Sequence, residues 1–120
     1  MAEDSKSASK ALEMILEKLN VRYISFSNGR ALLDYLHSEG VVEQVGAVIT
    51  DLEMPVISGF EVLKQIKNHP ESRHLPVIVN SSMSNDSNLE MASSLHADGF
   101  ISKSDPLQVE NLLRKFLGTN

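Results

Sequence analysis

The chain has 120 residues, no cysteine and a formal net charge of -5. This length fits one domain with one core, and the acidic balance argues against a general surface for nucleic acid or anionic membranes, since both need a basic face. Without cysteine there are no disulfides or thiolate metal sites. No apolar run approaches the roughly 18 residues of a membrane span, and the polar start MAEDSKSASK has no signal-peptide core, so we expect a cytoplasmic, single-domain protein without membrane insertion.

In the first half of the chain, segments with apolar residues at helical spacing alternate with short segments typical of strands. A helix is predicted from about Lys6, because apolar residues recur there at helical spacing, namely Leu12, Ile15, Leu16 and Leu19. The β-branched and aromatic stretch VRYISF predicts a strand over 21–26. A helix over 28–38 follows, with Asn28 as its N-cap, and the uniformly apolar AVIT predicts a buried strand over 47–50.

The second half continues the alternation. Phe60, Leu63 and Ile66 predict a third helix that ends near Pro70. After it we expect, in order, a strand over 76–82, a helix over 88–96, a strand over 99–102 and a last helix that has Pro106 in its first turn.

Strict alternation of helices and strands predicts an α/β fold, a doubly wound parallel sheet with helices on both faces. The order begins with a helix, although a strand should precede it. Only Met1 and Ala2 stand before the acidic Glu3 and Asp4, and two residues span only about 7 Å as a strand. The first strand is therefore expected to be largely truncated, with a gap that either stays partly open or is filled by another segment or chain.

Chemically active residues follow the predicted strands. In doubly wound sheets such residues gather at the carboxyl ends of the strands. Glu3 and Asp4 follow the truncated strand, Asp51 and Ser81 end the two inner strands, and Lys103 follows the last one. Converging carboxylates are costly without a cation, and hard oxygen ligands suit Mg²⁺. With a lysine and a hydroxyl for phosphate oxygens, the set has what phosphoryl transfer onto an aspartate requires.

Four motifs in this order, EDS, DLEMPVISGFEVL, PVIVNSS and ADGFISK, resemble the receiver domain of two-component response regulators over nearly the whole chain. The resemblance implies the flavodoxin-like strand order 2-1-3-4-5 and one receiver domain over 1–120. It implies the following roles: Asp51 as phosphoacceptor, Glu3 and Asp4 as Mg²⁺ acids, the Glu53 backbone carbonyl as a further metal ligand, Ser81 as switch hydroxyl, Lys103 as phosphate-binding lysine and Phe100 as aromatic switch.

The stretch 79–113 is similar, more narrowly, to the receiver domains of the chemotaxis coupling proteins CheV. Lys103 is followed by Ser104 instead of the usual proline, and Pro106 comes three positions after the lysine. This similarity implies a CheA-like sensor histidine kinase as partner, and a preceding CheW-like domain that links the receiver to the chemoreceptor array. The activity implied is signalling, with at most Mg²⁺-dependent self-phosphorylation and self-dephosphorylation, not that of an enzyme.

Several alternatives stay open from sequence alone. Glu3 and Asp4 can cap the first helix, and Lys103 can be a surface lysine. Ser82 replaces Ser81 if the strand end slips by one residue. The chain can also be a receiver-like interaction module that is never phosphorylated. The letters DLE faintly resemble the D-x-D start of haloacid-dehalogenase-like phosphatases, although Glu53 is longer than the aspartate expected there.

Two residues of the loop after Asp51 have predicted structural roles. Pro55 is expected to stiffen the turn into the next helix, and Gly59 to supply a backbone conformation that other residues resist.

Overall fold

The structure is a computed structural model that describes residues 1–2, 6–54, 56–82, 85–102 and 106–117. No helix within these ranges is both long and apolar enough to cross a bilayer. The predicted helices and the strands predicted over 47–50, 76–82 and 99–102 are confirmed, with ends within two residues of those predicted. The structure adds a short 3₁₀ helix, Val42–Gln44. In chain order the remaining elements are α1 (Lys6–Lys18), α2 (Gly29–Leu36), β1 (Val48–Asp51), α3 (Gly59–Asn68), β2 (Val77–Ser81), α4 (Asp86–Ser94), β3 (Gly99–Ser102) and α5 (Pro106–Leu117).

The strands form a parallel sheet in the order β1-β2-β3. Every residue of β1 and β2 is buried, as expected for strands covered on both faces. Successive side chains point to opposite faces, so Val77 and Val79 join one hydrophobic cluster while Ile78 joins the other. The doubly wound architecture follows from this division.

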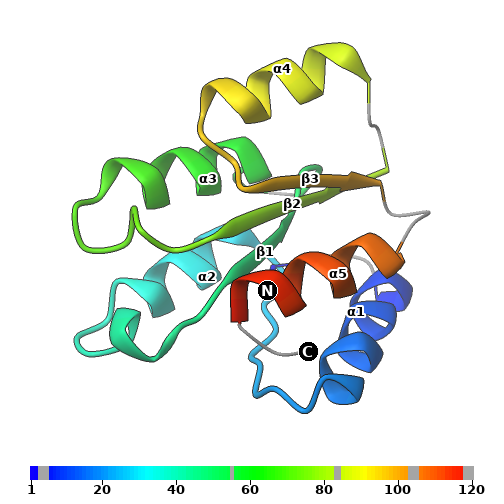
Figure 1. The fold of residues 1–120 in the computed structure, drawn as a ribbon. Coiled ribbons are helices and arrows are strands. Elements are labelled where there is room, and N and C mark those ends of the chain that lie inside the picture. The colour runs from blue at the N-terminus through cyan, green and yellow to red at the C-terminus, as the bar shows by residue number, and fades with distance from the viewer. Residues whose placement is uncertain (3–5, 55, 83–84, 103–105, 118–120) are drawn as a thin grey trace.

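Helices cover both faces of the sheet (Figure 1). On one face, α1 and α5 pack together over Ile49, Ile78 and Ile101. On the other, α2 and α3 pack over the valines of β1 and β2. Val109 and Leu113 of α5 complete the core of the layer that α1 and α5 form.

The first strand is reduced to a stub. Ala2 forms isolated parallel bridges to Phe26 on one side and to Thr50 of β1 on the other. This places the stub between the segment 21–26 and β1, and therefore confirms the predicted strand order 2-1-3-4-5 and the predicted truncation. The strand predicted over 21–26 is wrong, because only Phe26 bridges to a neighbour. A strand persists only where a neighbouring strand completes its hydrogen bonds, and the stub offers too few groups.

A cavity of about 850 Å³ lies where a longer first strand would run. Its walls are mainly apolar and come from the segment 21–26, from 44–49 at the start of β1, and from side chains of α1, α2 and α5. The Met1 amine donates to the Ile24 carbonyl over 2.7 Å. Burial lowers the pKa of this amine from its usual 8.0 to about 6. Within these 120 residues the gap is open, and the Met1 amine, whose charged form is disfavoured, lies at its end.

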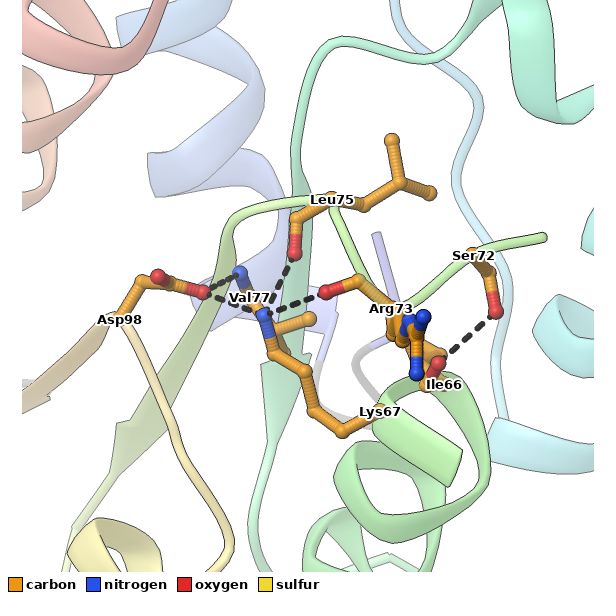
Figure 2. Close-up of polar contacts among 7 residues, drawn as sticks. All are labelled: Ile66, Lys67, Ser72, Arg73, Leu75, Val77 and Asp98. Atoms are coloured by element: carbon orange, nitrogen blue, oxygen red, sulfur yellow. Dashed lines mark hydrogen bonds and ion pairs between the residues drawn. The ribbon is translucent and has the colours of Figure 1, made fainter. Parts of the chain in front are cut away.

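At the amino ends of β2 and β3, one lysine joins the surrounding segments (Figure 2). The Lys67 amine donates to the carbonyl oxygens of Arg73 and Leu75, at 3.3 and 2.8 Å, and to Asp98 Oδ2 at 2.9 Å. The same Asp98 oxygen accepts the backbone N–H of Val77 at 2.8 Å. Lys67 thus joins the end of α3 to the loop before β2 and to the residue before β3.

Replacing this lysine by methionine, Lys67→Met, is expected to lower the free energy of unfolding by about 2–3 kcal/mol, since three hydrogen bonds of a largely buried charged group are lost. Urea titration measures the change. Lys64→Met removes an exposed lysine from the same helix and should change stability by less than about 0.5 kcal/mol. Equal destabilisation by the two substitutions would show that the network contributes nothing.

Candidate functional site

Two predicted site residues meet at the carboxyl edge of the sheet. Asp51 ends β1 and Ser81 ends β2. The register pairs Asp51 with Asn80, so Ser81 lies one residue further along the neighbouring strand. Both are buried, with 1% and 0% of their surface exposed, whereas Ser82 is exposed. The sheet therefore brings a carboxylate and a hydroxyl together at the edge where doubly wound folds bind ligands.

The loop after Asp51 is held against the sheet by backbone hydrogen bonds. The N–H of Leu52 donates to the Asn80 carbonyl over 3.2 Å, and the N–H of Gly59 donates to the Leu52 carbonyl over 2.9 Å. These bonds fix where β1 ends and where α3 begins. The position of the Asp51 side chain is thereby set by rigid elements on both sides of the loop.

Gly59 is needed for a reason other than the one predicted. Its φ is not positive, and the residue with the unusual backbone in this loop is Val56, with φ 73°. A side chain at Gly59 would collide with the backbone carbonyl of Asp51 and come within 2.8 Å of Leu52 Cα. The glycine therefore permits the close approach of α3 to the end of β1. Pro55, the other predicted loop residue, lies outside the described residues.

The Glu53 side chain adds a contact that the sequence did not reveal. Ser81 Oγ donates to Glu53 Oε1 over 2.6 Å, within the range of hydrogen bonds between hydroxyl groups and carboxylates. Glu53 is half-buried, and its Oε2 is buried without a hydrogen bond to any described residue. A role was predicted only for the backbone carbonyl of this residue, and the letters DLE gave no signal of a contact with Ser81.

Asn80 is a second polar residue at this edge for which no role was predicted from the sequence. It is buried in β2 directly opposite Asp51, and its Oδ1 has no hydrogen bond to any described residue. An unsatisfied buried acceptor is costly. The sequence feature that could have pointed to this residue is the single amide side chain in the otherwise apolar run VIVN.

Phe100, the predicted aromatic switch, lies in β3 opposite Val79, half-buried against the cluster under α2 and α3. The remaining predicted residues, Glu3, Asp4 and Lys103, lie outside the described residues. Their predicted roles stay predictions.

The oxygen atoms at this edge suit a hard cation. No three histidine, aspartate or glutamate side chains of the described segments gather as a metal site. The buried Asp51 carboxylate and the unsatisfied Oε2 of Glu53 nevertheless concentrate negative charge where Glu3 and Asp4 are expected to join. Carboxylate and carbonyl oxygens are the ligands that Mg²⁺ takes, so the donor chemistry fits such an ion.

Comparisons with known proteins agree with this arrangement. A family profile for the response regulator receiver domain matches residues 1–116. Chemotaxis protein CheV2 of Helicobacter pylori is 59% identical over 117 residues, which are 98% of this chain and 37% of that protein. Chemotaxis protein CheV1 of the same organism is 51% identical over 118 residues, again 98% of this chain and 37% of that protein. The chain thus spans little more than a third of these relatives.

Solved structures show the same fold. The Mn(2+)-bound form of response regulator Rcp1 superimposes with a TM-score of 0.80 at 25% identity, covering 97% of this chain and 90% of that one. Chemotaxis protein CheY4 of Vibrio cholerae has a TM-score of 0.82 at 19% identity, covering 96% and 93%. Because its sequence identity is low, the second similarity supports only the fold.

Proposed function

Because the chain belongs to the response regulator receiver domain family, we propose that it accepts a phosphoryl group on Asp51 and signals through the resulting change of shape. The observation that carries this is a buried carboxylate at the carboxyl end of β1, one register position from the buried hydroxyl of Ser81. Aspartates are almost never fully buried unless their carboxylate is paired or helps to hold a metal ion. We propose further that all 120 residues form one receiver domain.

In the proposed reaction a carboxylate oxygen of Asp51 attacks the phosphorus of a phosphohistidine on a kinase. A P–O bond forms, the P–N bond breaks, and the imidazole nitrogen that leaves takes up a proton. Lys103 would balance the charge of the phosphoryl oxygens, and the Ser81 hydroxyl would donate to one of them. Phe100 would then change its rotamer, which would alter the surface built by α4, β3 and α5.

The proposed metal is Mg²⁺, held by the Asp4 and Asp51 carboxylates and the backbone carbonyl of Glu53, with Glu3 acting through water. When bound, the cation supplies positive charge for the phosphoryl oxygens. The residues of the chain orient the nucleophile: the hydrogen bonds of Leu52 and Gly59 hold the end of β1, and the close packing of α3 covers it.

Chemotaxis is the proposed pathway, because two relatives that share more than half of their aligned residues with this chain are chemotaxis proteins. We propose a CheA-like histidine kinase as the phosphodonor, and a CheW-like domain outside these residues as the link to the receptor array. The site would lie in the cytoplasm and act on no nucleic acid. Any activity of its own would be limited to slow self-phosphorylation and self-dephosphorylation.

The competing function is a receiver-shaped interaction module that is never phosphorylated. A module freed from the chemistry would not need to retain a buried aspartate beside a buried serine at this edge. A phosphatase of the haloacid-dehalogenase type would need Glu53 to protonate a leaving group, whereas its Oε1 accepts a hydrogen bond from Ser81.

Incubation with Mg²⁺ and acetyl phosphate, followed by intact mass measurement, tests the proposal. The wild-type chain is expected to gain the mass of one phosphoryl group, and Asp51→Asn none, because an amide oxygen is a far weaker nucleophile. Asp34→Asn, a matched change at an exposed aspartate of α2, should leave the gain intact. A wild-type chain that stays unmodified would favour the interaction module.

A further inference from the structure

We propose that Glu53 is a positioning residue that holds the Ser81 hydroxyl in an inactive arrangement and competes with the phosphoryl group on Asp51 for it. The inference rests on the proposed function and adds a regulatory contact to that site. It assigns a role to the Glu53 side chain, separate from the metal-binding role predicted for its backbone carbonyl.

The contact is short and joins two separate elements. Ser81 Oγ lies 2.6 Å from Glu53 Oε1. Ser81 belongs to β2, which is fixed between β1 and β3, whereas Glu53 belongs to the loop after β1. Because the serine is fully buried and the glutamate half-buried, water competes only weakly for this hydrogen bond.

A serine hydroxyl carries one proton and can donate one hydrogen bond at a time. The proton that Glu53 accepts is therefore the one that a phosphoryl oxygen on Asp51 would need. To reach the phosphoryl group, the hydroxyl must first leave Glu53, and this lowers the apparent affinity of the site for the phosphoryl state.

Charge acts in the same direction. A phosphoryl group carries about -1.5 to -2 charges and three acceptor oxygens. The Glu53 carboxylate, two residues beyond Asp51 and with its Oε2 buried without a hydrogen bond to any described residue, adds negative charge beside it. The structure thus places both a competing acceptor and a repelling charge on one side chain, and the two effects can be separated by substitution.

Beryllofluoride, which mimics a phosphoryl group on aspartate, serves as the probe in the presence of Mg²⁺, with affinity measured by isothermal titration calorimetry. Glu53→Ala is expected to bind it about tenfold more tightly than wild type, since a hydrogen bond to a charged group is lost from the free state. Glu53→Gln removes the charge but keeps an acceptor, and should show a smaller gain. Glu71→Ala, at an exposed glutamate, should show none.

A second background isolates the role of the serine. In Ser81→Ala the gain from Glu53→Ala is expected to fall to about twofold or less, because there is no hydroxyl left to release. An equal gain in both backgrounds, or no gain in either, would overturn the inference while leaving the proposed function intact. If the wild-type chain bound no beryllofluoride, the proposed function would itself fail, and this inference with it.

Discussion

Four apolar residues added in front of Met1 are expected to raise the free energy of unfolding of the 120-residue chain by about 3 kcal/mol at pH 7. The added residues would run through the cavity of about 850 Å³ between the segment 21–26 and β1. Parallel pairing continued from Ala2 would supply hydrogen bonds to both sides, and the apolar walls would lose their contact with water. The segment 21–26 should then become a true strand.

Part of this gain comes from moving the terminal amine out of a buried position that disfavours its protonated form. The pKa of the Met1 amine is about 6 when folded and near 8.0 when unfolded. Between pH 6 and 8 the unfolded chain therefore binds more protons than the folded chain, so the stability of the 120-residue chain should rise with pH in this window. The difference corresponds to about 1–1.5 kcal/mol at pH 7.

A polar extension of the same length, Gly-Ser-Gly-Ser, is the matched control, because it moves the charge away but does not fill the cavity. Urea titrations at pH 6 and pH 8 should show the rise in stability with pH for the original chain and for neither extended chain. Only the apolar extension should gain the additional stability. Equal gains from both extensions would mean that the cavity does not accept a strand.

Gly59→Ala is expected to cost about 3 kcal/mol or more of folding stability, although alanine in a helix usually stabilises relative to glycine. The new methyl group would collide with the Asp51 carbonyl and approach Leu52 Cα, both of which are backbone atoms held by the sheet. To relieve the collision, α3 or the end of β1 must move. Phosphoryl acceptance from acetyl phosphate should therefore fall together with the urea midpoint.

Gly40→Ala is the control for this substitution. Gly40 has φ 80°, but a side chain there would meet no atom within 4 Å. The Gly40→Ala substitution should lower the free energy of unfolding by only about 1 kcal/mol, the cost of backbone strain, and leave phosphoryl acceptance unchanged. If both glycine variants behaved alike, close packing at Gly59 would not be what positions Asp51.

The alternation of helices and strands could be predicted because the spacing of apolar residues in each element matches the face that the fold buries. Leu12, Leu16 and Leu19 all lie in the cluster under α1, and the uniformly apolar strands proved to be covered on both faces. The segment 21–26 has equally strong strand propensity, yet it is no strand. Propensity describes one segment, whereas a ladder needs a neighbouring strand, and among the described residues the neighbour is only the stub of Met1 and Ala2.

The candidate site, likewise, could be predicted only in part. Its location followed from topology, because Asp51 and Ser81 had to end neighbouring parallel strands. The contact of Glu53 with Ser81 could not be predicted, because it depends on the rotamer of a long side chain and on how the loop turns. Likewise, Gly59 was expected to serve a turn, since a sequence does not show how closely α3 approaches the backbone of Asp51.

The most direct test of the central claim is to locate the phosphoryl group chemically. After incubation with Mg²⁺ and acetyl phosphate, borohydride reduces an aspartyl phosphate to homoserine, and peptide mass spectrometry identifies the residue converted. Conversion is predicted at position 51 and at no other aspartate or glutamate. Conversion elsewhere in a chain that has gained the phosphoryl mass, with position 51 unchanged, would contradict the claim that Asp51 is the phosphoacceptor.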